Sequence, residues 1–565
     1  MKKTQRFLSL LLCAALLIVT FAACSTENNA NDDKPQEGNN SEAAATITQK
    51  EGGIIEGEAA TEQVDKLVTT FAATNLDASP FIPSSGGAQV TPLLWASLIY
   101  RNTFGPALED CELWIAKSIT KIDEVTYDIE IYDYIKDSKG NHITADDVIF
   151  SYEMSRTLAQ FVAVGPDMDS LTKTGDFSLR MKLNKNAPGT IENLLGNFRL
   201  FICDQEWYEN ASEEERRIDP ATTGGYTVKS FVPGSSLVLQ AVENYWQSDD
   251  LLPSPTLRTV KEIEFRVITE PSVRAIAVEN REVDISAINA TDLHRFFKDG
   301  APIEGYNVVI GPGTASVFAF CNMDPGMSVL ADNVELRRAV LCAISPEDMM
   351  YATGNTDYTG TVLKALGLTT ESGYLEEWNN QDYFNYNPEK AREHFKLAGY
   401  EPGEVTVRLL ANNTSFNDSV RSVIIANLEE AGFKVDILAV DSALFNTYKT
   451  DSSQWDIMLD SKSSQTGNIV GLFDYLFNPA GYSSGNVCFA TDDELVALLK
   501  EATSNTNDET KRAFHKYIYD NAIVKGLYSN GFIVVSQDGI KEITTTYTTY
   551  LCPALVFKND YNSVG

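Results

Sequence analysis

A helix, a glycine and a strand follow one another between residues 419 and 437, and this step constrains the fold most strongly. Residues 419–431 repeat apolar side chains at the helical period, and Gly432 follows as a helix-ending residue. Three apolar residues at alternate positions from Phe433 then indicate a strand. A second strand signal, 456–459, follows about 20 residues later, which fits a βαβ-like crossover. The sequence therefore predicts a sheet with helices packed on it.

The same helix and strand signals recur along the whole chain. Residues 127–132 alternate apolar and polar side chains, as in a strand with one buried face. Capping residues followed by apolar periodicity predict helix starts. These capping residues are Thr144, Ser345, Asn387 and Thr491. Because 565 residues are too many for one hydrophobic core, we expect a mixed α/β protein with several lobes.

The charge balance excludes one class of partner. The chain has 45 Lys and Arg against 79 Asp and Glu, so its formal net charge is −34. Such a field repels a phosphate backbone, and nucleic acid is not expected as a partner. The ordinary reading of this charge is a soluble, well-hydrated surface.

The first 60 residues resemble an export signal followed by a tether. Residues 1–6 are basic, 7–23 are mostly apolar, and the run ends in two alanines and Cys24. This small-small-Cys ending resembles a bacterial lipobox, which implies cleavage before Cys24 and a lipid on its thiol. An ordinary signal peptide that happens to contain a cysteine is the alternative. Residues 25–60 are dominated by small and polar side chains and predict a flexible tether.

The sequence contains no recognisable catalytic or metal-binding constellation. There are four His residues. The nucleophile motif GxSxG, the phosphate-binding loop GxxxxGK[ST] and the zinc-protease motif HExxH do not occur. The cysteines show no zinc-ligand spacing. We therefore predict that the protein is not an enzyme and needs no metal or other cofactor.

One strand runs directly into a polar loop that is a candidate ligand site. The segment 456–468 begins with alternating apolar residues and continues with Ser, Lys, Gln and Thr. Strand ends that open into such loops often hold ligands in α/β proteins.

Six segments, in order, resemble the extracytoplasmic solute-binding proteins of ABC importers, in the family of the oligopeptide-, dipeptide- and nickel-binding members. The matching segments are 107–131, 139–152, 223–246, 279–285, 336–344 and 387–400. Of these, 139–152 (KGNHITADDVIFSY) and 387–400 are similar to signature stretches of the family.

The resemblance implies an α/β, two-lobed periplasmic-binding-protein-like fold (type II, cluster C) with an extra subdomain in the first lobe. The implied order is a signal peptide (1–23), a tether (24–60), lobe I (61–104), the subdomain (105–190), lobe I again (191–295), lobe II (296–500) and a return segment of lobe I (501–565). It also implies a monomer at the extracytoplasmic face of the bacterial cell membrane, anchored by lipid, that closes on a ligand and delivers it to ABC permease subunits.

The resemblance also assigns candidate ligand contacts. Residues at matching positions are Ser85, Gln89, Tyr226, Phe318, Phe320, Asp460, Ser463 and Gln465. For the three aromatic residues the alternative is core packing, and for Ser463 and Gln465 it is a solvated loop. In the family's peptide binders an Asp at the Gln465 position holds the ligand's ammonium group. Gln465 is neutral and cannot supply that charge.

Several ligand and function classes therefore stay open. A peptide is the leading ligand, and the neutral Gln465 favours a non-peptide solute such as an oligosaccharide. A metal chelate has less support, because the His and Arg residues of nickel-type members have no counterpart that we can locate. A receptor that senses its ligand without transport is the alternative from another class.

Overall fold

The computed structural model describes residues 46–48, 64–82, 87–101, 107–157, 168–185, 187–197, 199–253, 256–464, 466–478, 488–543, 555–557 and 561–564. Residues Ala44–Gly565 belong to one compact unit, and residues 1–43 lie outside the described residues. The predicted signal peptide and Cys24 therefore lie outside them too. No helix in the described ranges is long and apolar enough to cross a membrane.

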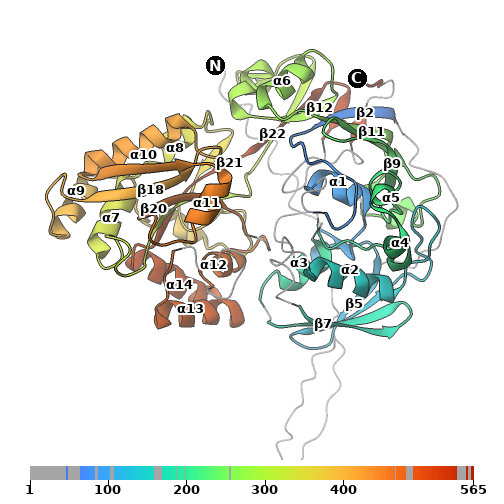
Figure 1. The fold of residues 1–565 in the computed structure, drawn as a ribbon, viewed down its shortest axis with the longest axis horizontal. Coiled ribbons are helices and arrows are strands. Elements are labelled where there is room, and N and C mark those ends of the chain that lie inside the picture. Colours follow the sequence, from blue (N-terminus) through green and yellow to red (C-terminus); the bar gives the residue numbers. More distant parts are fainter. Residues whose placement is uncertain are drawn as a thin grey trace, which may run out of the picture. The chain divides into compact units, whose positions relative to one another are not determined.

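A seven-stranded sheet with its helices forms lobe I (Figure 1). Its strands, in spatial order, are β15 (Tyr306–Gly311), β22 (Phe532–Gln537), β12 (Ile285–Ile288), β2 (Val64–Phe71), β11 (Val260–Val267), β10 (Ser236–Ala241) and β9 (Tyr226–Val232). Its helices are α1 (Gly87–Leu94), α4 (Gln205–Asn210), α5 (Glu213–Ile218) and α6 (Pro271–Glu279). Two hydrophobic clusters pack against this sheet, one with Leu67 and Phe265 and the other with Val68 and Val535.

A five-stranded sheet forms the subdomain. Its strands, in spatial order, are β1 (Thr46–Thr48), β5 (Ala116–Lys121), β6 (Thr126–Ile131), β8 (Ser178–Leu183) and β7 (Met168–Gly175), and its helices are α2 (Ala145–Thr157) and α3 (Thr190–Gly196). Ile119, Ile129 and Leu179 are buried in its own hydrophobic core. β1 pairs with β5, although it lies within the segment predicted as a flexible tether. The tether prediction is therefore wrong for residues 46–48.

A six-stranded sheet with helices around it forms lobe II (Figure 1). Its strands, in spatial order, are β17 (Gly360–Val362), β21 (Val524–Asn530), β16 (Ser316–Cys321), β20 (Ile457–Lys462), β18 (Thr406–Asn412) and β19 (Lys434–Val440). Its helices are α7 (Val334–Ala343), α8 (Pro346–Ala352), α9 (Pro388–Leu397), α10 (Asp418–Ala431), α11 (Ser442–Tyr448), α12 (Ile469–Phe477), α13 (Asp493–Ser504) and α14 (Asp508–Asp520).

Short elements connect these sheets. They are the strands β3 (Ile99–Tyr100), β4 (Glu112–Leu113), β13 (Phe297–Lys298), β14 (Ala301–Pro302), β23 (Ile540–Glu542) and β24 (Val556–Phe557), and the 3₁₀ turns η1 (Leu108–Asp110), η4 (Asp249–Leu251), η6 (Ala290–Arg295) and η7 (Glu376–Asn380).

The helix–glycine–strand step forms as the sequence predicts. Asn417 caps α10 by accepting a hydrogen bond from Val420 N, and Gly432 ends it in the left-handed conformation, with φ 115°. β19 then pairs in parallel with β18, and β18 pairs in parallel with β20. The two crossovers place β18 between its partners, which gives lobe II its βαβ character.

The chain passes between lobe I and lobe II at two neighbouring connections. β15 pairs with β22 in lobe I, while the strands that follow and precede them, β16 and β21, pair in lobe II. The connections are therefore residues 311–316 and 530–532, and they are tied together where Ser529 Oγ donates to Ala315 O at 2.8 Å. The predicted lobe boundaries near 296 and 501 are corrected by these pairings, because β15 belongs to lobe I and β21 to lobe II.

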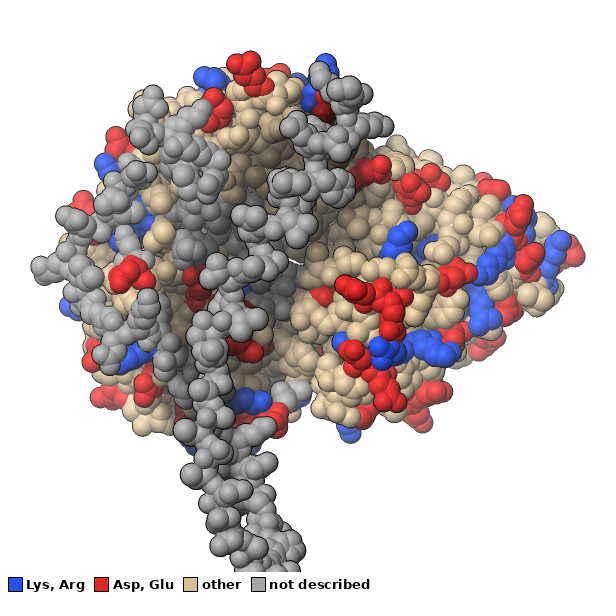
Figure 2. Space-filling model, turned by 180° about the vertical axis from the view of Figure 1, so that it is seen from behind, with Lys and Arg blue, Asp and Glu red and all other residues tan. Residues whose placement is uncertain are grey.

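The surface carries both signs of charge. Figure 2 shows Asp and Glu side chains spread over the visible face with Lys and Arg side chains among them. Many of these charges form exposed ion pairs, such as Arg180 with Asp128 and Arg512 with Glu377.

Candidate functional site

The candidate site lies at the end of the buried strand β20. It pairs with β16 on one side and with β18 on the other, so Ile457, Met458 and Leu459 are fully buried. The alternation predicted from the sequence is therefore part of a central strand with two buried faces. Asp460 and Ser461 are less buried, and the polar loop begins after Lys462.

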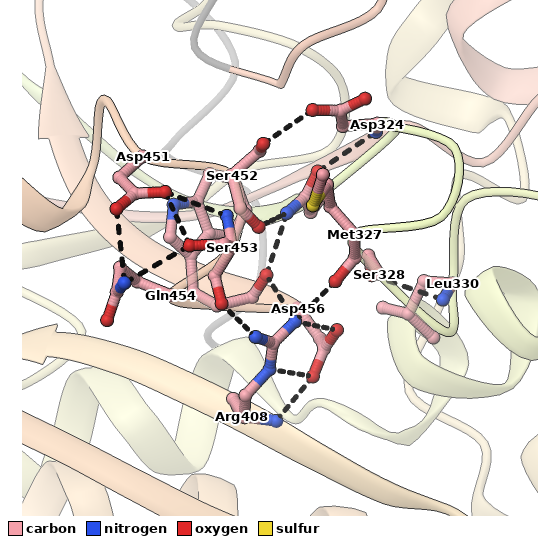
Figure 3. Close-up of polar contacts among 12 residues, drawn as sticks. Asp324, Met327, Ser328, Leu330, Arg408, Asp451, Ser452, Ser453, Gln454 and Asp456 are labelled. Carbon is pink, nitrogen blue, oxygen red and sulfur yellow. Dashed lines mark hydrogen bonds and ion pairs between the residues drawn. The ribbon is translucent and has the colours of Figure 1, made fainter.

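A polar clamp fixes the start of this strand (Figure 3). The guanidinium of Arg408 donates to both carboxylate oxygens of Asp456, with Nε–Oδ2 at 2.9 Å and Nη2–Oδ1 at 2.8 Å. The backbone N–H of Arg408 donates to the same carboxylate at 2.8 Å. Arg408 Nη2 also donates to Met327 O at 2.7 Å, which ties a neighbouring loop to the strand. Asp456, the residue before β20, is thus a structural residue, 2% exposed.

Two charged residues lie at the other end of β20. Lys462 Nζ and Asp460 Oδ2 are 2.7 Å apart, and Lys462 Nζ lies 5.7 Å from the ring centroid of Tyr475. Burial opposes the charge of Lys462, but the Asp460 carboxylate and Tyr475 together outweigh it and raise the lysine's pKa. Nearby, burial and then the charge of Lys462 lower the pKa of Lys449. This strand end therefore holds an ion pair in partly dry surroundings.

The loop after β20 is anchored to the rest of lobe II. Ser372 N donates to Gly467 O at 3.0 Å, and Ile469 N donates to Ser372 O at 2.9 Å. Asn468 then caps α12 by accepting from Val470 N at 2.9 Å. Ser464 and Thr466 are buried, at 3% and 7% exposure. Residues 464 and 466–468 of this loop are therefore packed against the rest of lobe II.

The five polar contact candidates divide into three groups. Ser85 and Gln465 lie outside the described residues. Gln89 lies on α1 and donates through Nε2 to Thr70 O at 3.3 Å, next to the end of β2. Asp460 and Ser463 lie together at the end of β20, where both side chains are half-buried. Their role as ligand contacts stays a prediction.

The three aromatic candidates are buried in hydrophobic cores. Tyr226 is 1% exposed, and its hydroxyl donates to Val260 O at 2.8 Å. Phe318 and Phe320 are fully buried in the core of lobe II, 5.5 Å apart between ring centroids. This burial favours the core-packing alternative for all three, since a buried ring exposes no surface to a ligand.

A cavity of about 570 Å³ lies beside α4 and α5, away from β20. Several of its polar groups already have partners within the chain. Lys139 pairs with Asp219 at 2.8 Å and lies over the Trp207 ring, and Asp204 caps α4 by accepting from Trp207 N. Burial raises the pKa of Asp204 to about 6. These engaged groups make the cavity a weaker candidate than the end of β20.

Metal chemistry finds no support in the described part of the chain. There, no group of three or more His, Cys, Asp or Glu side chains is arranged to hold a metal ion. The five cysteines in those ranges are buried.

The sequence reading missed the paired connections between the lobes. A Cβ atom at Gly531 would lie 2.7 Å from Gly311 O, and one at Gly313 would lie 2.2 Å from Asn530 O. Glycine is therefore required for the two connections to approach each other. The available signal was Gly-Pro-Gly at 311–313 and Asn-Gly at 530–531, two turn-like glycine segments far apart in the sequence.

Two lobes joined by paired connections, with an additional subdomain, define a two-lobed α/β solute-binding protein. Residues 111–484 match the family model of bacterial extracellular solute-binding proteins, family 5 Middle. The chain belongs to this family, which confirms the resemblance seen in the sequence. It is therefore an extracytoplasmic solute-binding protein of the ABC-importer type, and its relatives are binding proteins of transporters and not enzymes.

Known relatives match this chain over more than two thirds of their own length. The chain is 21% identical to the dipeptide-binding protein of Escherichia coli, over 66% of this chain and 69% of the relative. It is 22% identical to the oligopeptide-binding protein AppA of Bacillus subtilis, over 72% and 75%. The crystal structure of a putative peptide-binding protein AppA from Clostridium difficile covers 87% of this chain and 100% of its own, at 14% identity and a TM-score of 0.71.

Proposed function

We propose that the protein is a lipid-anchored receptor that captures a peptide between lobe I and lobe II and delivers it to an ABC permease. Ser85 and Gln89 of lobe I and Asp460, Ser463 and Gln465 of lobe II are the proposed contacts. Cys24 carries the lipid, residues 25–45 and 49–60 tether the folded body, and the receptor works as a monomer. The relatives named as dipeptide- and oligopeptide-binding proteins support a peptide ligand.

The two neighbouring connections between the lobes carry this proposal. Short strand-to-strand connections that absorb backbone rotation are the usual hinges of domain closure. A ligand that contacts both lobes stabilises the closed arrangement by its higher affinity for that state. The clamp at Asp456 supports this role, because it keeps the strand that carries Asp460 and Ser463 fixed while the lobes move.

The neutral Gln465 gives weight to a second ligand class within the same mechanism. An amide group cannot neutralise an ammonium group, but it both donates and accepts hydrogen bonds, as a sugar hydroxyl requires. A non-peptide solute such as an oligosaccharide is therefore the second candidate. A receptor that senses ligand without transport shares the same binding step.

A thermal-shift screen separates the ligand classes. Ligand that binds the folded state raises the melting temperature in proportion to the logarithm of its concentration over Kd. We expect di- to pentapeptides to raise it and oligosaccharides to leave it unchanged. A shift with a sugar and none with any peptide would overturn the peptide proposal.

The Gln465→Asp variant tests where the peptide amine lies. If the amine is next to residue 465, the new carboxylate should tighten peptide binding about tenfold, because a charge-assisted hydrogen bond replaces a neutral one. Gln381→Asp, at an exposed position, is the matched control. Calorimetric titration with a peptide and its N-acetylated form measures the effect, and unchanged affinity would remove residue 465 from the amine site.

The Cys24→Ser variant tests the anchor. Without the thiol no lipid can be attached, so the protein should move from the membrane fraction to the soluble fraction of the cells or medium. A variant that stays in the membrane fraction would contradict lipid attachment at this residue.

A further inference from the structure

An ion pair joins the subdomain to lobe II. Lys185, which follows β8, places Nζ 2.8 Å from Oδ2 of Asp474 on α12. The two residues are 289 positions apart. Asp474 is 7% exposed, and its other oxygen accepts from Asn478 Nδ2 at 2.9 Å. The carboxylate is thus held in a fixed orientation toward the lysine.

A second contact lies beside the ion pair. Gly189, four residues after Lys185, has φ 80° and approaches Thr466 so closely that a Cβ atom would lie 2.6 Å from Thr466 Cβ. Thr466 belongs to the loop that follows β20, and its hydroxyl accepts from Asn468 N at 3.3 Å. Lys185 and Gly189 therefore lie against residues 466–474, which include the end of the proposed ligand loop.

The two partners of this ion pair belong to separately packed parts of the chain. Lys185 extends from the five-stranded sheet, whose core is separate from that of lobe II. Asp474 is held by α12, between the buried residues Phe473 and Leu476. The pair can form only when the subdomain and lobe II adopt the arrangement seen here. Its free energy therefore stabilises that arrangement over any in which the lobes separate.

We propose that Lys185 is a positioning residue whose ion pair with Asp474 holds the 466–474 segment against the subdomain, and so biases the receptor toward closure and slows ligand release. The effect on ligand release rests on the proposed function, whereas the bias toward closure does not. Loss of a pair whose carboxylate is buried costs far more than loss of an exposed pair. Removal of Lys185 should therefore shift the closed-to-open ratio about tenfold.

A distance measurement on the ligand-free full chain tests this. Spin labels are placed at Glu130 of β6 and Glu501 of α13, both exposed, in the otherwise unchanged protein. Pulsed electron resonance then gives the distance distribution between the subdomain and lobe II. Lys185→Met should move the distribution to longer distances. Lys182→Met is the matched control, because Lys182 lies on β8, the strand that precedes Lys185, and pairs with Asp169 inside the subdomain.

Two further variants separate the ion pair from a general loss of structure. Asp474→Asn should lengthen the distance as Lys185→Met does, and the double variant should be no more open than either single one. The charge exchange Lys185→Glu with Asp474→Lys should restore the shorter distance. A distribution in Lys185→Met identical to that of the parent protein, or an equal change in Lys182→Met, would overturn the proposal.

The ligand step has its own readout. With a peptide that binds the parent protein, Lys185→Met should raise the dissociation rate about tenfold and leave the association rate nearly unchanged. An unchanged dissociation rate would overturn the link to release. Absence of binding by any peptide would instead count against the proposed function and leave the distance result standing.

Discussion

Buried charged residues in lobe II serve the structure in two ways. Some are paired, as Asp456 is with Arg408, and some are neutral in the folded state because their surroundings exclude water. His515 belongs to the second kind: it stacks on Trp378 with ring centroids 4.4 Å apart, and its Nε2 accepts from Leu366 N. These two kinds respond differently to mutation and to pH.

The clamp at the start of β20 should be important for stability. Arg408→Met leaves the buried Asp456 carboxylate without its countercharge, so we expect the free energy of unfolding to fall by about 2–3 kcal/mol. Arg392→Met, which breaks the exposed pair with Glu430, should cost less than about 0.5 kcal/mol. Urea unfolding measures both. Equal costs for the two variants would show that the clamp is not a stabilising pair.

His515 should make the protein less stable in acid. Burial lowers its pKa to about 4, below the ordinary value of 6.5. Between these two values the imidazole is protonated in the unfolded chain and neutral in the folded chain. Its contribution is fully present above about pH 6.5 and is lost as the pH falls toward 4. At pH 4 the loss approaches about 3 kcal/mol. His515→Phe should flatten this part of the stability–pH curve, whereas His294→Gln, at an exposed position, should not; equal curves would contradict the assignment.

At the scale of elements, the sequence predicts helix starts well where the cap is local. Ser345 and Asn387 cap α8 and α9 as expected, by accepting from the N–H groups of Asp348 and Lys390. The expected cap at Thr491 is wrong by one residue: Asp492 caps α13, and it also accepts from the hydroxyl of Tyr517 on α14. That contact is tertiary, so a local pattern cannot predict it.

Strand partners and site geometry were also hard to predict, because they depend on tertiary contacts. The sequence indicates β20 and the loop after it, but not that β21 pairs in lobe II and β22 in lobe I. Such pairings join residues more than 200 positions apart, and periodicity carries no information about them. The aromatic candidates Phe318 and Phe320 turned out to be buried because β16 lies in the centre of the sheet.

The close approach of the two connections predicts a sensitive glycine. In Gly531→Ala the new methyl group would lie 2.7 Å from Gly311 O and 2.9 Å from Thr359 O, both backbone atoms that cannot move easily. We expect a loss of about 1–3 kcal/mol in the free energy of unfolding. Gly225→Ala is the control, since its methyl group would meet the flexible side chain of Arg258 at 3.1 Å. Similar stability of the two variants in urea would refute this packing argument.

The C-terminal segment should stabilise lobe I through one buried carboxylate. Asp284 is fully buried and accepts hydrogen bonds from Val68 N, Tyr561 Oη, Ser563 Oγ and Val564 N. Truncation before Tyr561 removes three of these donors and should lower the free energy of unfolding by several kcal/mol. In the truncated chain that also carries Asp284→Asn, the loss in free energy of unfolding should be smaller than the sum of the losses from the truncation alone and from Asp284→Asn alone. Thermal melting tests this, and strict additivity would contradict a shared role.

At the scale of the whole molecule, we propose that a fixed ligand-binding strand and two movable lobes work together. In this mechanism the clamp at Asp456 fixes β20, the connections at 311–316 and 530–532 act as the hinge, and the Lys185–Asp474 pair adds a bias toward closure. A receptor of this kind binds by closing around its ligand.

Small-angle X-ray scattering with and without ligand tests the central claim most directly. The full extracytoplasmic chain, with residues 1–23 absent, is measured alone and with a saturating peptide taken from the thermal-shift screen. We predict that the peptide lowers the radius of gyration, because closure brings the two lobes together. A radius of gyration that stays the same while the peptide is bound would contradict capture by lobe closure.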